Sequence, residues 1–225
     1  MVGSPSLAPR GGSGLRERHK QRRRGAILRA VRDLLREGGE AALTKERIAE
    51  RAEVAPATVY NLVGTRTRLW AALAEDFSEE LERRLAERRL ADPVARLRQV
   101  VEHTVELFVE DPEVARRILR GWEESGQVLR GGPILHFVRA VEAAQLAGVL
   151  GSALDSRLLA SSVAVGCVGA VHQWAAGLID ADRFRARARL AADVALAAAA
   201  TDAHRQRLLR PLRRRRGVAS PAEGA

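Results

Sequence analysis

Cysteine and aromatic residues are scarce in this chain. Its 225 residues include a single cysteine, Cys167, and aromatic residues make up only 4%. One cysteine excludes an internal disulfide and is typical of proteins in a reducing compartment, so we expect a cytoplasmic location. The first twenty residues are mostly Gly, Ser, Pro and Arg without an apolar core, so no signal peptide is expected.

Sequence motifs for catalysis and for metal binding are also lacking. No Gly-x-Ser-x-Gly, His-Glu-x-x-His or Walker pattern occurs, and no acid or base neighbours Cys167 in its apolar segment. The histidines at 103, 136 and 172 fall in three separate predicted helices and lack the paired spacing of a metal site. We therefore expect no enzyme, no cofactor and no metal.

Apolar residues at helical spacing are what the chain does contain. Hydrophobic residues make up 46% of the sequence, Ala, Leu and Arg are abundant, and β-branched residues do not alternate with polar ones. This pattern predicts an all-α protein. The predicted helices cover residues 25–37, 45–52, 56–62, 65–90, 93–110, 113–124, 134–150, 155–178 and 182–209.

The segment 158–179 is almost long and apolar enough to span a bilayer. It carries Ser161, Ser162, His172 and Gln173, which are costly in a membrane. A helix that is buried or lies in an interface is the better interpretation, so we expect no membrane association.

Residues 44–66 predict two short helices joined by a tight turn. Thr44 is a suitable N-cap for the first helix, and Pro56 suits the first position of the second. The outward positions of the second helix are uncharged: Ala57, Thr58, Tyr60 and Asn61. Because a solvent-facing helix usually carries Glu and Lys, this pattern favours a helix that enters the major groove of DNA. An ordinary αα-hairpin is the alternative.

The helix-turn-helix and its surroundings resemble the N-terminal domain of TetR-family transcriptional regulators. The match covers residues 22–75 and includes the spacing of Thr44, Ile48-Ala49, Val54, Thr58-Val59-Tyr60, Arg66 and Leu69. Two positions depart from the family pattern. Glu53 stands in the turn where Gly is usual, which predicts a strained or altered backbone, and Ala55 replaces a capping Ser or Thr at a cost of about 1 kcal/mol.

The resemblance implies two groups of DNA contacts. Positions that hold phosphates match Thr44, Thr58, Tyr60 and Arg66. Positions that reach base edges match Pro56, Ala57 and Asn61, together with Lys45 or Glu46. Asn61 is suited to pair with adenine and Ala57 to pack on a thymine methyl group. Phosphate contacts set the register on DNA, whereas only the base contacts select a sequence.

Positive charge is concentrated at the two ends of the chain. The net charge is +10, and residues 1–24 and 203–225 each hold seven Arg or Lys against one acid, whereas residues 71–202 hold sixteen against twenty. This asymmetry predicts a polyanionic partner. We expect a disordered basic arm over 1–21, the DNA-binding domain over 22–68, an effector-binding and dimerisation domain over 69–210, and a disordered basic tail over 211–225. The arm either follows DNA or is a solvated segment.

The helices predicted over 69–210 consist mostly of Leu, Val and Ala, but they also carry some aromatic side chains and some side chains with a polar tip. The resemblance implies that some of them line an apolar cavity for a small-molecule effector. A closed core is the alternative. The candidates are His103, Phe108, Trp122, Phe137, His172, Gln173 and Trp174.

Small residues form stripes on the last two predicted helices and allow a close approach of other helices. They are Gly166, Gly169, Ala170, Ala195, Ala198 and Ala199, and the larger Gln173 falls on the first stripe. They predict a homodimer, although the stripes can also pack against each other within one chain. Two recognition helices roughly 34–36 Å apart would read a near-palindromic operator on double-stranded DNA.

The sequence therefore predicts a dimeric repressor of the TetR type that a small apolar ligand releases from its operator. In this hypothesis the ligand displaces the short helix that carries Trp122 and so pivots the helix over 65–90. A non-specific nucleoid-coating module or a helical protein-interaction module is the alternative. An activator, or a regulator without an effector, fits the same sequence.

Overall fold

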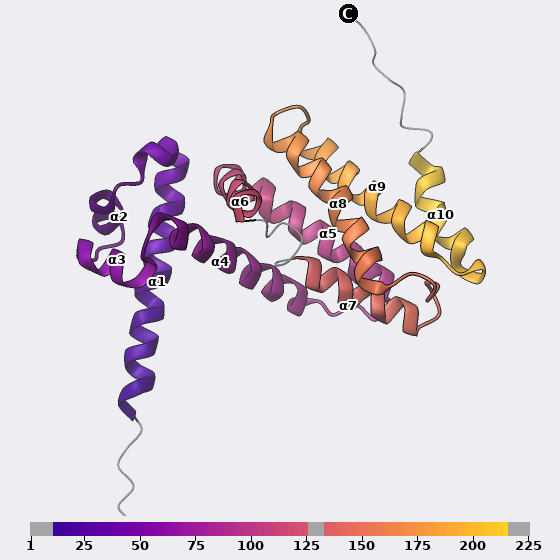
Figure 1. Cartoon of the computed structure of the whole chain (residues 1–225), viewed down its shortest axis with the longest axis horizontal. Helices are drawn as coiled ribbons and strands as arrows, with labels where there is room; N and C mark the ends of the chain where they lie inside the picture. Colours follow the sequence, from indigo (N-terminus) through magenta and orange to yellow (C-terminus); the bar gives the residue numbers. More distant parts are fainter. Residues whose placement is uncertain (1–10, 126–132, 216–225) are drawn as a thin grey trace, which may run out of the picture. The chain divides into compact units, whose positions relative to one another are not determined.

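The computed structural model describes residues 11–125 and 133–215, which are helical apart from short connections (Figure 1). This confirms the predicted all-α class. The chain divides into two units, residues 1–73 and 74–225. The first unit contains α1 (Gly11–Gly38), the short 3-10 helix η1 (Gly39–Ala42), α2 (Lys45–Arg51), α3 (Pro56–Val63) and the start of α4 (Arg66–Glu87).

The core of the first unit is mostly aliphatic and is built around α1. Ile27, Val31 and Leu34 recur at helical spacing on α1, and none is more than 1% exposed. Buried residues of the next two helices complete this core, namely Ile48 and Ala49 of α2 and Val59 and Val63 of α3. Burial of the apolar stripes therefore fixes the positions of α2 and α3 on α1.

The helix ends in this unit follow the sequence closely. The Thr44 side chain accepts a hydrogen bond from the Arg47 backbone N–H at 3.2 Å and caps α2. Pro56 begins α3, whose N-cap, Ala55, makes no side-chain hydrogen bond. Glu53 has φ 53°, and it is the only residue other than glycine with positive φ in the part that the structure describes. The expected departures at Glu53 and Ala55 are both present.

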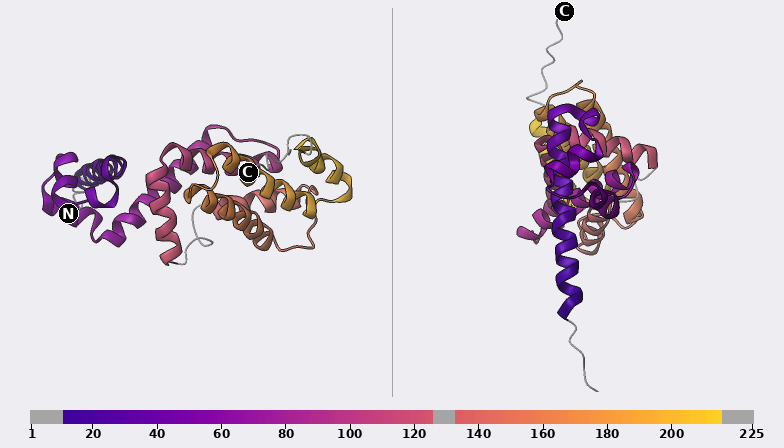
Figure 2. Two further views of the ribbon diagram at one scale, coloured as in Figure 1. Left: turned by 90° about the horizontal axis from the view of Figure 1, so that it is seen from above. Right: turned by 90° about the vertical axis from the view of Figure 1, so that its left-hand side faces the viewer.

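The first helix begins earlier than the sequence pattern predicts. Residues 11–21 are helical, so the prediction of a disordered arm is wrong for them, while residues 1–10 lie outside the described part. Arg, Lys, Gln and Glu are strong helix formers, and a helix that extends from a packed nucleus pays no further nucleation cost. Figures 1 and 2 show α1 continuing well past the level of α2 and α3 within its unit.

The second unit begins within α4 and contains six further helices. These are α5 (Pro93–Glu110), α6 (Pro112–Ser125), α7 (Pro133–Leu146), α8 (Ser156–Ala175), α9 (Ala181–Ala199) and α10 (Asp202–Arg215). Helix α5 packs against α7 and α9, and α8 also contacts both of those helices. By length and composition alone α8 could cross a membrane, and it packs on α7 and α9 along part of its surface.

The predicted helix over 182–209 is two helices, because the chain breaks at Ala200. The backbone of Ala200 is extended and pairs with Leu150 in an isolated bridge, and Thr201 N–H donates to the Val149 carbonyl at 3.1 Å. This break depends on tertiary contacts, and no Gly or Pro announces it in the sequence. Helix α10 continues to Arg215, so the predicted disordered tail is wrong for 211–215, and residues 216–225 lie outside the described part.

Candidate functional site

The outer face of α3 is open to solvent. Tyr60 is 58% exposed, and Pro56, Ala57 and Asn61 are also exposed, whereas Thr58 is half-buried. Val59 on the opposite face is buried. The uncharged surface that the sequence assigns to DNA is therefore accessible, and the helix that presents it is held from behind by its apolar face.

The start of α2 lies in the same unit and presents three exposed polar side chains, Thr44, Lys45 and Glu46. Although Thr44 uses its hydroxyl oxygen to cap α2, its O–H group can still donate a hydrogen bond to a phosphate. Lys45 supplies a positive charge in the first turn, so this helix end can meet the DNA backbone.

Arg66, at the first position of α4, is held by contacts within its own unit. Its Nη2 donates to the Glu40 carbonyl at 3.0 Å and lies 3.7 Å from the Glu40 carboxylate. The guanidinium also lies 5.9 Å from the centre of the Trp70 ring. A guanidinium has five N–H donors, so these contacts orient the side chain and leave donors for a phosphate oxygen.

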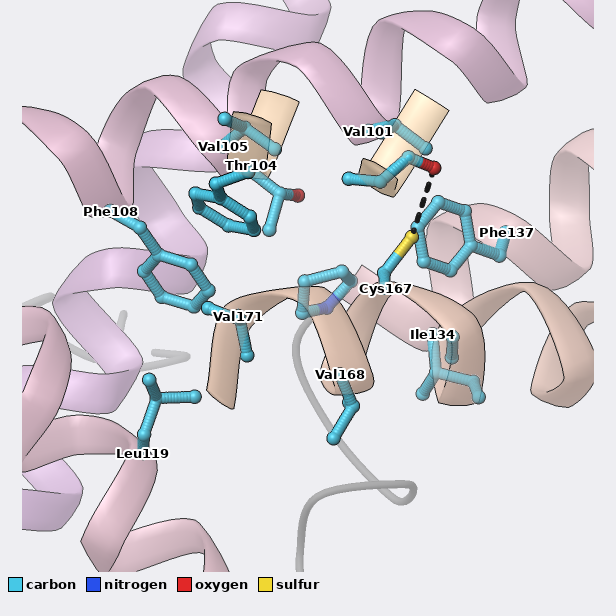
Figure 3. Close-up of a pocket in the computed structure, with 14 residues that line it drawn as sticks. Val101, Thr104, Val105, Phe108, Leu119, Ile134, Phe137, Cys167, Val168 and Val171 are labelled. Carbon is cyan, nitrogen blue, oxygen red and sulfur yellow. Dashed lines mark hydrogen bonds between the residues drawn. The ribbon is translucent and has the colours of Figure 1, made fainter. Parts of the chain in front are cut away.

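An apolar cavity of about 60 Å³ lies among the helices of the second unit. Figure 3 shows Phe108 and Leu119 at one side of the cavity and Ile134 and Phe137 at the other, with Cys167 between them. The lining comes from α5, α6, α7, α8 and α9, and consists of Val101, Thr104, Val105, Phe108, Leu119, Pro133, Ile134, Phe137, Ala164, Cys167, Val168, Val171, Phe184 and Ala188.

Only two side chains in this lining carry a heteroatom, Thr104 and Cys167. The Thr104 hydroxyl donates to the Val100 carbonyl at 2.7 Å, and the Cys167 thiol donates to the Ala188 carbonyl at 3.7 Å. Burial raises the pKa of Cys167 to about 12. The thiol is therefore neutral near pH 7 and poorly nucleophilic, so the cavity is suited to binding rather than to chemistry.

Of the seven residues predicted to bind an effector, Phe108 and Phe137 line the cavity. Four others do not. His103 pairs with Glu106, with 2.9 Å between Nδ1 and Oε2, and His172 is exposed on α8. Gln173 is half-buried, and Trp174 lies behind the cavity wall. The side chain of Trp122 is outside the described part of α6.

Sequence reasoning missed most of the lining because it looked for polar-tipped groups. Thr104, Val105 and Phe108 share one face of α5 with Val101, at spacings of three, four and seven residues. That periodicity was visible in the sequence. It could not show that this face borders an unfilled space, because the same pattern describes a closed core.

Stacked aromatic rings connect the cavity wall to α4. Phe108 stacks on Phe77 of α4 with 4.9 Å between ring centres, and its ring centre lies 6.5 Å from that of Phe184 on α9. Phe184 in turn stacks on Trp174 at 5.2 Å. A displacement of Phe108 must therefore disturb Phe77, which is a buried residue of α4.

The predicted dimer residues divide into buried and exposed positions. A Cβ atom on Gly166 would lie 2.6 Å from the Ala191 Cβ of α9, so Gly166 serves close packing within the chain. Ala170 and Ala199 are buried, while Gln173 and Ala195 are half-buried. Only Gly169 and Ala198 are exposed. Gly166 therefore serves the packing of α8 on α9 within one chain, and the role of the other positions in a dimer stays a prediction.

A second, more polar groove of about 480 Å³ lies between α4, α5 and α7. Arg89, Arg96 and Arg139 line it together with Glu82 and His136. The guanidinium of Arg96 donates to the Leu90 and Ala91 carbonyls in the connection between α4 and α5. The pKa of His136 is lowered, mainly by burial. Within residues 11–125 and 133–215, no three His, Cys, Asp or Glu side chains are grouped as a metal site would need.

No protein-family model and no curated protein sequence matches the chain. Solved structures match most of it. SmeT, the repressor of the Stenotrophomonas maltophilia multidrug efflux pump SmeDEF, is 27% identical, with a TM-score of 0.58 over 80% of this chain and 91% of that chain. SmeT in complex with triclosan matches at 24% identity and a TM-score of 0.57, over 80% and 92% of the two chains.

Two other solved structures match this chain with similar TM-scores. A TetR transcriptional regulator from Rhodococcus sp. RHA1 is 16% identical, with a TM-score of 0.59 over 79% of this chain and 97% of that chain. The transcriptional regulator FadR from Bacillus subtilis, in complex with stearoyl-CoA, is 18% identical, with a TM-score of 0.60 over 76% and 96%. The fold that the sequence resemblance implied is confirmed.

Proposed function

The chain has the fold of the TetR-family transcriptional regulators, and from that premise we propose that it is a homodimeric repressor released from its operator by a small apolar ligand. The observation that carries the proposal is the exposed, uncharged face of α3 on a rigidly packed helix. Such a face is of little use to a surface hairpin but fits the floor of a major groove.

In this proposal the exposed face of α3 reads the bases. Asn61 is suited to adenine and Ala57 to a thymine methyl group, while Tyr60, Thr58, Thr44 and Arg66 hold phosphates. The exposure of Tyr60 and Asn61 and the fixed position of Arg66 beside Glu40 support these roles. Lys45 and Glu46 at the start of α2 flank the same contact.

The proposed dimer surface is an exposed stripe on α8 and α9. Gly166 and Ala191 mark where these antiparallel helices meet. On α8, Val165 comes one residue before Gly166 and Gly169 three residues after it. On α9, Leu190 and Val194 have the same spacing from Ala191. Residues with the same spacing from the contact point lie on the same side of an antiparallel helix pair. This places 54% exposed Val165 and 50% exposed Val194 on one apolar face, which a second copy can cover.

The proposed effector is an apolar compound, because the cavity offers almost no polar groups. Its 60 Å³ is well below the 300–1,000 Å³ typical of drug-sized ligand sites. An effector must therefore push the cavity walls apart in order to enter. The complexes of SmeT with triclosan and of FadR with stearoyl-CoA support a largely apolar ligand for this fold.

The proposed switch runs from the cavity to α4 through Phe108 and Phe77. Entry of a ligand displaces Phe108, and its stacked partner Phe77 belongs to the helix that starts at Arg66 in the DNA-binding unit. Arg84 also ties α4 to α5 through two hydrogen bonds to Glu110, at 2.8 and 2.6 Å. A coupling of about 1–3 kcal/mol between ligand and DNA is enough for such a switch.

The proposal is tested by operator binding of Tyr60→Ala and Asn61→Ala in mobility-shift titrations. The operator is the sequence that the parent protein enriches from a random duplex pool. Both variants should bind it about 5- to 150-fold more weakly, as expected for the loss of a contact worth about 1–3 kcal/mol. Gln206→Ala, at an exposed position of α10, is the control. Parental affinity in both α3 variants would remove α3 from the DNA interface.

A further inference from the structure

The N-terminal part of α1, residues 14–24, extends beyond the packed core of its unit (Figure 2). Every residue from 14 to 23 is exposed, and the one large apolar side chain among them, Leu15, is 54% exposed. We call residues 14–24 the basic arm. It carries five arginines and one lysine against a single acid, Glu17.

The positive side chains of the basic arm form a stripe with a defined direction. Arg16, Lys20 and Arg23 precede Ile27 by eleven, seven and four residues, so they lie on the side of α1 that Ile27 occupies. Ile27 is fully buried in the core that α1 shares with α2 and α3. The stripe therefore continues toward the N-terminus on the same side of α1 as the helix-turn-helix.

Contacts within the arm do not account for this charge. Glu17 lies 3.9 Å from Lys20 and accepts a hydrogen bond from Gln21 at 3.3 Å, and the Arg18 guanidinium donates to the Gly14 carbonyl at 3.2 Å. With Glu17 as its one carboxylate the arm has a formal net charge of +5, from six cations less one anion, and like charges at helical spacing repel each other. A polyanion that lies along the stripe would relieve this repulsion.

We propose that the basic arm is a preformed helical clamp for the DNA backbone, which contacts phosphates outside the bases that α3 reads. This inference rests on the proposed function, because it needs the helix-turn-helix to hold the duplex. The eleven residues of the arm span about 16 Å as a helix. Duplex DNA carries about nine phosphate charges over that length. The arm adds affinity and salt dependence and leaves sequence choice to α3.

The test compares two full-length triple variants that lose the same charge. The arm variant is Arg16→Gln, Lys20→Gln and Arg23→Gln. The control is Arg88→Gln, Arg157→Gln and Arg210→Gln, at exposed positions of the second unit. Glutamine keeps a high helix propensity, and far-UV circular dichroism checks that both variants keep the helical content of the parent. Operator affinity is measured between 0.05 and about 0.5 M salt.

Each lost phosphate contact should lower the slope of log affinity against log salt by about 0.9. The arm variant should therefore lose about two to three units of slope and bind the operator about 10- to 500-fold more weakly at 0.1 M salt. The sequence enriched from a random pool should not change. The control should keep the parental slope. An Arg16→Lys, Arg23→Lys variant, which keeps the charge, should also keep it.

An arm variant with the parental slope would overturn the proposal, as would an arm variant that enriches a different sequence. Equal losses in the arm and control variants would also overturn it, because they would reflect net charge alone. Failure of the proposed function looks different. In that case the parent protein itself enriches no sequence, whatever its salt dependence.

Discussion

The two units differ in the side chains that build their interiors. The first unit packs a mostly aliphatic core around α1 and exposes its candidate DNA-contacting side chains on α2 and α3. The second unit stacks aromatic rings around an unfilled apolar cavity. A closed core holds a reading surface in one geometry, whereas a cavity gives a ligand space to occupy and walls to displace. A surface that contacts DNA needs a rigid support, whereas a site for a ligand needs space between helices.

Shortening Phe108 should have the largest effect, and it should be confined to the second unit. Phe108→Ala removes a stacked ring from the cavity wall and should cost about 3–5 kcal/mol of unfolding free energy. Leu34→Ala, in the core of the first unit, should cost about 2–5 kcal/mol there. Hydrogen exchange resolved by helix measures both changes. Loss of protection in α5 and α8 in response to Leu34→Ala would contradict separate cores.

Filling the cavity should block the ligand and spare DNA binding. Ala164→Val adds two methyl groups to the cavity wall on α8 and should weaken binding of triclosan, used as an apolar probe, by at least about 10-fold, since each buried CH₂ is worth about 0.8 kcal/mol. Ala203→Val, on the exposed surface of α10, is the control for helix propensity. Calorimetry gives the affinities. Equal triclosan binding by both variants would show that the probe binds elsewhere.

The backbone at Glu53 offers a smaller test within the first unit. Glu53→Gly should raise stability by up to about 1 kcal/mol, because glycine avoids the cost of a left-handed conformation, although its unfolded-state entropy offsets part of the gain. Glu50→Gly, three residues earlier in α2, should instead lower stability by about 1 kcal/mol. Denaturant midpoints give both values. The same sign for both substitutions would contradict strain at the turn.

The smallest expected effect depends on pH and concerns α4. Hydrogen bonds from Arg83 and then Arg84 lower the pKa of Glu80 to about 2 from its ordinary value of 4.5. A lowered pKa stabilises the fold above pH 4.5, and this stabilisation is lost as pH falls from 4.5 toward 2. Glu80→Gln should remove this pH-dependent loss of unfolding free energy. The loss is under about 1 kcal/mol, because the ion pairs of Glu80 with Arg83 and Arg84 are partly exposed to solvent.

Glu79→Gln, at the exposed position before Glu80, is the matched control and should keep the parental pH dependence. Chemical denaturation at pH 5 and at pH 3 measures the difference for each variant. Identical pH dependence of the two variants would mean that the ion pairs of Glu80 do not stabilise α4.

The first unit could be predicted from the sequence because local signals fix it. Thr44 and Pro56 mark where α2 and α3 begin, and the strained turn at Glu53 was expected because glycine is usual at that position. The helical arm was missed because a charged segment with few apolar residues has the composition of a disordered one. The arm is helical because it extends the packed part of α1, which contains Ile27, Val31 and Leu34.

In the second unit, helix positions were predictable but their surroundings were not. The break at Ala200 depends on Leu150 and Val149, which are about fifty residues away in sequence. Whether an apolar face borders a cavity or a closed core depends on how five helices meet, so only Phe108 and Phe137 were found. Gly166 likewise serves α9 of its own chain, which its small size alone could not reveal.

The most direct measurement of the central claim is selection of bound fragments from a random duplex DNA pool by the full-length protein, followed by sequencing. A dimer that reads DNA through α3 should enrich one near-palindromic sequence, with half-sites whose centres are about 10 base pairs, or a multiple of that spacing, apart. Asn61→Ala should lose the preference at the base that it contacts, whereas Tyr60→Ala, which loses a phosphate contact, should bind more weakly and enrich the same sequence. Equal recovery of all sequences by the parent protein would contradict the claim that α3 reads DNA.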